Sequence, residues 1–201
     1  TTILILNVSL SAQYYYIPNT TNPGNPGGLN TDAEYPGPPG GANGMPAGWN
    51  TILGSSNSSP NWSSTETIPF SFNFNGSPVT QYKVSSSGIL TFTTSASTVP
   101  TYSNAAIPNA SIPDQSVLVW GIEGSGANDE IVTKTFGSAG SQQHWIWFAS
   151  YTYGTLWTYW SIVLEEGSDK KKSILDFEII KKLDNYYLLE INLKTGRHII
   201  C

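Results

Sequence analysis

The side chains able to do chemistry are few and widely separated in this sequence. The two histidines, His144 and His198, lie in different parts of the chain, and the single cysteine, Cys201, is the last residue. A tetrahedral zinc site needs about four nitrogen or thiolate ligands, and one cysteine cannot form an internal disulfide. We therefore expect no metal site, no cofactor and no disulfide scaffold.

Two carboxylate pairs, Asp32/Glu34 and Asp129/Glu130, have the oxygen chemistry that Ca²⁺ prefers. The sequence lacks the EF-hand or repeat spacing that would support calcium binding. Serine is abundant, but no Gly-x-Ser-x-Gly turn is present to favour a Ser–His–Asp triad. The residues by themselves predict a protein that is not an enzyme.

Aromatic residues are concentrated between His144 and Trp160. In a regular strand the odd positions 145, 147, 151 and 153 share one face. One interpretation is a platform on which sugar rings stack; the other is core filling with cross-strand aromatic pairs, which is the more ordinary outcome. The candidate aromatic binding surface comprises Trp145, Trp147, Tyr151, Tyr153, Trp157 and Trp160.

Composition narrows the class of protein. Of the 201 residues 39% are hydrophobic and only 11% are charged, against about a quarter in typical globular domains. No apolar run approaches the ~18 residues of a membrane span, and Gly and Pro are too frequent for a long helical protein. A net charge of −5 also disfavours nonspecific binding of nucleic acid.

Period-2 alternation begins after a Gly/Pro-dense stretch at residues 21–48. Phe70, Phe72 and Phe74 fall on one face of residues 68–74, and Asn75-Gly76 follows as a turn dipeptide. Further strands are predicted at residues 81–85, 89–94, 116–121, 129–136, 143–153 and 156–164. We predict a mainly β fold, an antiparallel, jelly-roll-like β sandwich with a Gly/Pro-rich N-terminal arm and a C-terminal β hairpin.

The ends of the chain differ from its middle. Residues 1–12 have the pattern of a truncated signal peptide remnant, with a first strand as the alternative. Residues 165–201 hold 14 of the 23 charged side chains. We therefore divide the chain into the remnant 1–12, an arm 13–49, a β-sandwich domain 50–166, a junction 167–172 and a separate segment 173–201. The alternative is a charged strand pair belonging to the same β domain.

Several motifs in the first part support a family resemblance: NPGGLNTDAEYPGPPGG, PAGW, IPFSFNFNGSPVTQYKVSSSGILTF and WTYWSIVLEE. With them, residues 13–166 resemble the N-terminal β domain of Bacteroidetes-type secreted surface proteins. The resemblance implies an exported, non-catalytic module at the cell surface, with surface glycans or proteins as partners.

The last part carries a different resemblance. Residues 170–198, KKKSILDFEIIKKLDNYYLLEINLKTGRH, resemble a fragment of the RluA-type RNA pseudouridine synthases. Thr195, Gly196, Arg197 and His198 occupy the positions of that family's Thr-Gly-Arg-His motif, where the arginine neighbours the active site. The catalytic His-Arg-Leu-Asp motif is missing, and residues 1–164 contain no arginine. RNA as a partner and a cytoplasmic location follow only if this fragment functions.

Three functions therefore compete on sequence grounds: an adhesion or binding module with a foreign tail, a pseudouridine synthase, and a carbohydrate-binding module. Residues 173–183 and 186–193 are expected to pair as a hairpin around Asp184-Asn185. If the tail is foreign, this hairpin either stays exposed or adds loosely to a free sheet edge.

Overall fold

The computed structural model describes a β-rich core of the chain. It describes side chains and backbone for residues 28–32, 48–54, 59–74, 76–101, 109–118, 129–149 and 161–167, and backbone alone for residues 13–15, 150–153, 156–160, 177–182, 190–193 and 197–200. The expected signal remnant at residues 1–12 lies outside the described residues, as do residues 168–172 of the expected junction.

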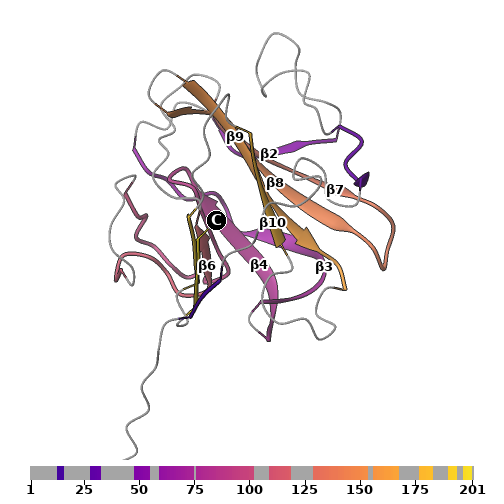
Figure 1. Cartoon of the computed structure of the whole chain (residues 1–201), viewed down its shortest axis with the longest axis horizontal. Helices are drawn as coiled ribbons and strands as arrows, with labels where there is room; N and C mark the ends of the chain where they lie inside the picture. Colours follow the sequence, from indigo (N-terminus) through magenta and orange to yellow (C-terminus); the bar gives the residue numbers. More distant parts are fainter. Residues whose placement is uncertain are drawn as a thin grey trace, which may run out of the picture.

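Two antiparallel sheets form a sandwich, and no α-helix occurs among the described residues. The larger sheet has the order β10-β9-β8-β7-β2, and the smaller has the order β3-β4-β5-β6. Figure 1 shows β7, β8 and β9 of the larger sheet in orange beside the magenta β3 and β4 of the smaller one. The strands of the larger sheet are β2 (Asn50–Leu53), β7 (Glu130–Phe136), β8 (Gln143–Tyr153), β9 (Leu156–Glu165) and β10 (Phe177–Lys182); those of the smaller are β3 (Glu66–Phe74), β4 (Ser77–Ser85), β5 (Ile89–Thr91) and β6 (Ser116–Leu118).

The predicted mainly β sandwich is confirmed. Consecutive strands are neighbours in both sheets, except that β2 joins the larger sheet beside β7. The smaller sheet and the β7–β10 part of the larger sheet are therefore meanders, and the described strands do not show the Greek-key order of a jelly roll. A third, three-stranded sheet joins β1 (Gln13–Tyr15), β12 (Arg197–Ile200) and β11 (Glu190–Leu193), in which β1 and β12 run parallel.

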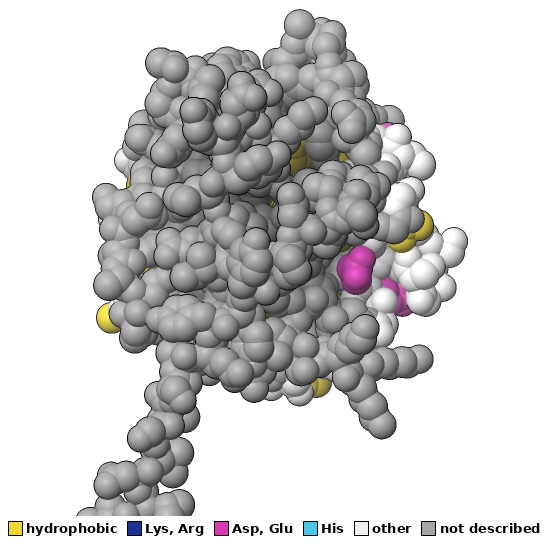
Figure 2. Space-filling model, viewed as in Figure 1, with side chains coloured by type: hydrophobic (Ala, Val, Ile, Leu, Met, Phe, Trp, Pro, Cys, Tyr) yellow, Lys and Arg dark blue, Asp and Glu magenta, His cyan; other side chains and the backbone are white. Residues whose placement is uncertain are grey.

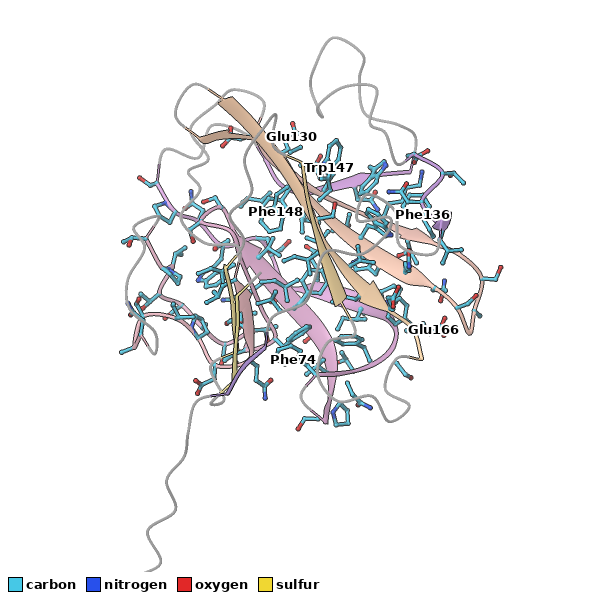
Figure 3. The ribbon with its side chains drawn as sticks, in the orientation of Figure 1. Phe74, Glu130, Phe136, Trp147, Phe148 and Glu166 are labelled. Atoms are coloured by element: carbon cyan, nitrogen blue, oxygen red, sulfur yellow. The ribbon has the colours of Figure 1, made fainter. Side chains whose placement is uncertain are left out.

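The main core lies between the two sheets and follows the period-2 pattern. Phe72 and Phe74 of β3 are 4% and 5% exposed, whereas the intervening Asn73 is less deeply buried. Ile146 and Phe148 of β8 and Ile162 of β9 meet them from the other sheet. Figure 3 shows Phe148 and Phe74 among the side chains between the layers.

The outer faces of both sheets are also covered. Trp145, Trp147 and Val163 form a second core on the outer face of the larger sheet, beneath Trp49 and Leu29. Ile89, Ile112 and Leu118 form a third core outside the smaller sheet, with Trp62 against it. Residues 116–118, the described part of the strand predicted at 116–121, are buried throughout, so this segment is covered on both faces.

The tail pairs differently from the prediction. Residues 177–182 of β10 pair antiparallel with β9, and β11 pairs with β12 instead. The expected hairpin between residues 173–183 and 186–193 is therefore wrong, and the C-terminal hairpin is formed one strand later. The reason lies in the edge of β9, whose backbone N–H and C=O groups would otherwise be unpaired. Of the two placements expected for a foreign tail, the structure shows addition to the sheet edge.

Gly137 ends β7 at a positive φ of 87°, in the turn that leads to β8. A Cβ placed there would lie 2.7 Å from the Ser141 carbonyl oxygen, closer than real Cβ contacts come. Gly140 in the same turn also has a positive φ, of 92°, but a Cβ there would meet open space. Substitutions at these two glycines therefore distinguish the cost of a left-handed backbone, common to both, from the cost of steric overlap, present only at Gly137.

We predict that Gly140→Ala costs roughly 1–2 kcal/mol of unfolding free energy, from the left-handed conformation alone. Gly137→Ala is predicted to cost about 1–3 kcal/mol more, because the added methyl overlaps backbone. Urea unfolding of both variants, followed by tryptophan fluorescence, measures the difference. Equal losses in the two variants would show that the turn relaxes around the Gly137 methyl.

Candidate functional site

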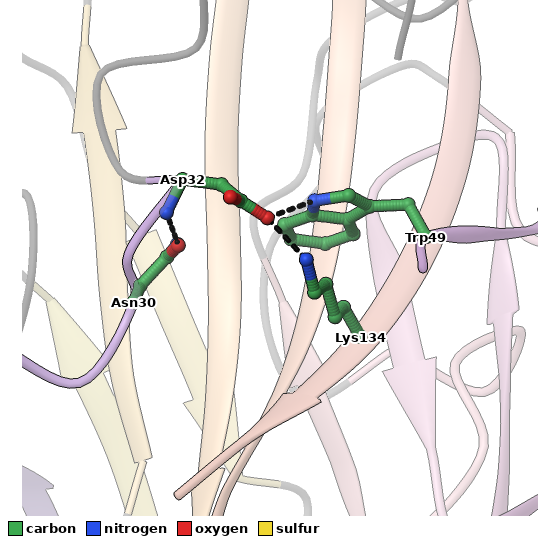
Figure 4. Close-up of polar contacts among 4 residues, drawn as sticks. All are labelled: Asn30, Asp32, Trp49 and Lys134. Carbon is green, nitrogen blue, oxygen red and sulfur yellow. Dashed lines mark hydrogen bonds and ion pairs between the residues drawn. The ribbon is translucent and has the colours of Figure 1, made fainter. Parts of the chain in front are cut away.

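A polar cluster joins a segment of the N-terminal arm to the outer face of the larger sheet (Figure 4). We call residues 28–32 the strap. The Asp32 backbone N–H donates to Asn30 Oδ1 at 2.8 Å, an Asx turn that orients the aspartate. Asp32 Oδ2 then accepts a hydrogen bond from Trp49 Nε1 at 3.2 Å and pairs with the Lys134 ammonium of β7.

Lys134 is held from several sides. Its Nζ lies 5.0 Å from the centroid of the Phe136 ring, within cation–π range. Gly48 leaves room for the lysine stem, since a Cβ at that position would lie 3.4 Å from Lys134 Cε. The side chains of Lys134 and Asp32 are about one-fifth exposed, 20% and 21%. The pair therefore lies at the boundary between solvent and the second core.

Beneath the strap, Trp49 packs against Trp147 and Phe136, with ring centroids 5.7 Å and 5.9 Å apart. Trp145 and Trp147 are each only 1% exposed. In Figure 3, Trp147 and Phe136 lie on the β2 side of the orange sheet. Trp145 and Trp147, both predicted to bind sugars, are therefore core side chains, and neither ring is accessible to a sugar in this structure.

The aromatic residues beyond Phe148 fall out of register with Trp145 and Trp147. Phe148 pairs with Trp160, but Tyr151 pairs with Thr158, so β8 contains one extra residue between them. This β-bulge exchanges the two faces of the strand. Positions 151 and 153 are thus in phase with position 160, whereas position 157 keeps the phase of positions 145 and 147.

The expectation that positions 145, 147, 151 and 153 share one face is therefore wrong, because it assumed a regular strand. The side chains of Tyr151, Tyr153, Trp157 and Trp160 lie outside the described residues. A binding role for these four aromatic residues stays a prediction.

Glu165, the last residue of β9, and Glu166, which follows it, both accept hydrogen bonds that hold neighbouring parts of the fold. Gln143 Nε2 donates to Glu165 Oε1 at 2.6 Å, and Trp145 Nε1 donates to Gln143 Oε1 at 3.1 Å. Glu166 Oε2 accepts from the backbone N–H groups of Gly140 and Gln142, at 2.7 Å and 3.1 Å. The glutamates of the LEE motif therefore fix the buried indole and the β7–β8 turn.

A second polar group lies between the sheets. His144 of β8 is 7% exposed, and its Nε2 lies 2.8 Å from the Tyr82 hydroxyl of β4. Its Nδ1 lies 2.9 Å from Thr135 Oγ1 of β7. Burial lowers the pKa of His144 to about 4, and burial together with the nearby Glu66 carboxylate raises the pKa of Tyr82. The imidazole is thus neutral at ordinary pH.

Lys83 and Lys134 are the two basic residues of the first 164 positions. Lys83 is 7% exposed, donates to the Ala96 carbonyl and lies 4.7 Å from the Trp62 ring centroid. Burial lowers its pKa. The sequence signal for both structural lysines is their rarity in this part of the chain, whereas nothing in the sequence pointed to Asn30.

The remaining predicted site residues are placed as follows. Among the described residues, no three His, Cys, Asp or Glu side chains are grouped as metal ligands. The Asp32 carboxylate, a calcium candidate by sequence, is neutralised by Lys134 instead, and Glu34 lies outside the described residues. Thr195 and Gly196 also lie outside them, while Arg197 and His198 are described by backbone alone, in β12.

A family model described as NIDO related matches residues 48–170, more than half of the chain. The chain belongs to the NIDO-related family. The NIDO-related match begins at the glycine beside Lys134 and continues beyond the turn that follows β9. It is an extracellular-type domain, in loose agreement with the predicted secreted surface module.

The NIDO-related match ends at residue 170, so the resemblance of residues 170–198 to pseudouridine synthases stays a prediction. No curated protein and no solved structure is significantly similar to the chain. Within the described part of the structure, no helix has the length and apolar character needed to cross a membrane.

We predict that Asp32 and Lys134 are energetically coupled. Asp32→Asn and Lys134→Met, alone and together, form a double-mutant cycle whose coupling free energy should be about 1 kcal/mol, at the upper end for partly exposed ion pairs. Because the pair is partly solvated, the coupling should decrease at high salt. Urea unfolding at 20 mM and 1 M NaCl, both chosen as roughly limiting conditions, measures it.

Asp114→Asn is the matched control, since Asp114 is an exposed carboxylate near the smaller sheet. It should show little coupling to Lys134→Met. Additive losses for Asp32→Asn and Lys134→Met would instead mean that the strap is held by Trp49 and Leu29 alone.

Proposed function

We propose that this chain is a non-catalytic binding module of a secreted or cell-surface protein, with an adhesive role. The observation that carries the proposal is its membership of the NIDO-related family, an extracellular-type domain that is typically non-enzymatic. The way in which the core uses its titratable side chains supports the same conclusion.

Among the described residues, three side chains that could act in acid–base chemistry, His144, Asp32 and Lys83, are engaged in structural contacts. Both nitrogens of His144 are bonded to hydroxyl groups between the sheets. Asp32 is paired with Lys134, and Lys83 lies beneath Trp62. A general base needs free access to the proton that it abstracts, whereas His144 and Lys83 are buried and Asp32 is occupied by Lys134 and Trp49.

The partner that we propose is a glycan or a protein at a cell surface. The covers over the outer faces leave strand edges, turns and loops for recognition, as in many β-sandwich modules. On the face drawn in Figure 2, the charged side chains visible among the described residues are acidic. A net charge of −5 does not favour RNA as the partner.

The second candidate function, an RNA pseudouridine synthase, rests only on the resemblance of residues 170–198 to that family. We propose that residues 173–201 are an enzyme-like segment that is inactive on its own, because the catalytic His-Arg-Leu-Asp motif of the pseudouridine synthases does not occur in this sequence. A carbohydrate-binding module is the narrower form of the main proposal, with Tyr151, Tyr153, Trp157 and Trp160 as the residues to test.

We predict saturable binding of the full chain to immobilised extracellular glycans or proteins, measured by biolayer interferometry over a panel of both. If sugars are the ligand, Trp157→Ala should weaken binding by about tenfold or more, since one stacked ring contributes of order 1–3 kcal/mol. Trp62→Ala, on the smaller sheet, is the matched control and should leave glycan binding unchanged.

The same preparation should release no tritium from 5-tritiated uridine in ribosomal RNA above a no-protein control. Pseudouridine formation that Arg197→Ala abolishes would overturn the non-catalytic assignment. Glycan binding that Trp62→Ala weakens as much as Trp157→Ala would move the binding surface to the smaller sheet.

A further inference from the structure

The hydrogen-bonded chain Tyr82–His144–Thr135 spans the gap between the two sheets. Tyr82 belongs to β4 of the smaller sheet, while His144 and Thr135 are paired neighbours on β8 and β7 of the larger one. The rings of Tyr82 and His144 meet edge to face, with centroids 5.7 Å apart. Tyr82 is fully buried and belongs to the main core.

The groups around the imidazole offer little compensation for a positive charge. On the β9 side its paired neighbour is Leu164, which is fully buried. On the β7 side Thr135 and Thr133 provide hydroxyls, and Thr133 is also a hydrogen-bond partner of Tyr82. In the described part of the chain both ring nitrogens are taken by hydroxyl groups, so neither is bonded to a carboxylate.

The charged groups of the neighbouring strands are directed to other partners. Glu66 of β3 is paired with Tyr82 across the strands and lies near its hydroxyl. Glu165 of β9 is bonded to Gln143, and Lys134 of β7 pairs with Asp32 beneath the strap, on the outer face. Among these acidic groups, Glu66 has the most direct link to the imidazole, and that link runs through Tyr82. Its carboxylate raises the pKa of Tyr82, whereas the pKa of His144 is set by burial.

We propose that this chain makes the attachment of the two sheets sensitive to acid, so that the module loosens on entering a mildly acidic environment. The neutral imidazole donates to one hydroxyl and accepts from the other. A protonated ring would donate at both nitrogens, so both hydroxyls would have to accept, and its charge would be buried between apolar side chains. Acid thus opposes the packing that joins β4 to β8.

The sign and the pH range follow from the difference between the folded and unfolded chain. The unfolded histidine takes up a proton near pH 6.5, whereas in the folded chain burial lowers the pKa to about 4. Stability is complete above about pH 7, falls as the pH drops below 6.5 and levels off below 4. Linkage gives an increase of about 30-fold in the unfolding equilibrium constant between pH 7.5 and 5.

Urea unfolding of the full chain at pH 7.5 and pH 5 tests the proposal, with wild type, His144→Gln and His198→Gln compared. Between pH 7.5 and 5, the unfolding equilibrium constant should increase equally in wild type and in His198→Gln. In His144→Gln the increase should be about 30-fold smaller. The comparison between variants is needed because Glu130, whose pKa is raised by burial and by Asp129, stabilises the fold in acid. Equal acid losses in all three proteins would overturn the proposal.

A second measurement keeps the proposal testable if His144→Gln does not fold. The ring of His144 in folded, isotope-labelled wild type can be titrated by NMR from pH 7.5 to 4.5. We expect the His144 ring to remain neutral at pH 5.5 while the fold is intact. A folded protein with a protonated His144 at pH 6 would overturn the proposal, whatever the variants do.

Discussion

Burial of the larger sheet on both faces is the constraint on which the rest of this structure depends. One face of β7, β8 and β9 meets the smaller sheet, and the other carries Trp145 and Trp147. A second apolar face needs its own cover, which Trp49 and the strap supply. It also needs partners for each indole N–H, because an unpaired buried polar group costs free energy. Asp32 accepts the hydrogen bond of the Trp49 indole, and Gln143 accepts that of the Trp145 indole.

The same constraint accounts for the sparse charge of this module. The basic residues of the first 164 positions each lie against an aromatic ring and bond to an oxygen acceptor. Charges that remain partly buried are tolerated only when they are paired in this way. The charged C-terminal segment meets the sheet at one edge, where β10 lies beside β9, and edge strands readily carry lysines.

Local periodicity was enough to predict the strands from β3 to β9, but it missed the short β1, β2 and β12 and failed where pairing changes phase. The alternation in β3 and the turn glycines at 76 and 88, both at positive φ, could be read from residue types alone. The bulge between Phe148 and Tyr151 could not, since β8 has no proline or glycine to mark it. Nor could the strap: residues 28–32 read as part of a loop, yet Asn30 is 2% exposed and Leu29 packs on the second core. Such contacts arise from tertiary packing, which a linear pattern does not contain.

The contact between Asp32 and Lys134 joins residues 102 positions apart in the chain. Closing a loop of that length costs conformational entropy, which the ion pair alone does not offset. Docking of the strap is therefore favourable only after β7 and β8 have paired and present the surface on which it packs. It therefore belongs among the last parts to assemble and the first to open, as a locally cooperative unit with its own lower opening free energy. Trp145 and Trp147 are in this sense covered by a layer that docks late. Hydrogen exchange at the Trp49 indole N–H, which donates to Asp32, would report the opening of that layer, whereas the backbone amides of Trp145 and Trp147 lie in the β7–β8–β9 ladder and would report the stability of the sandwich.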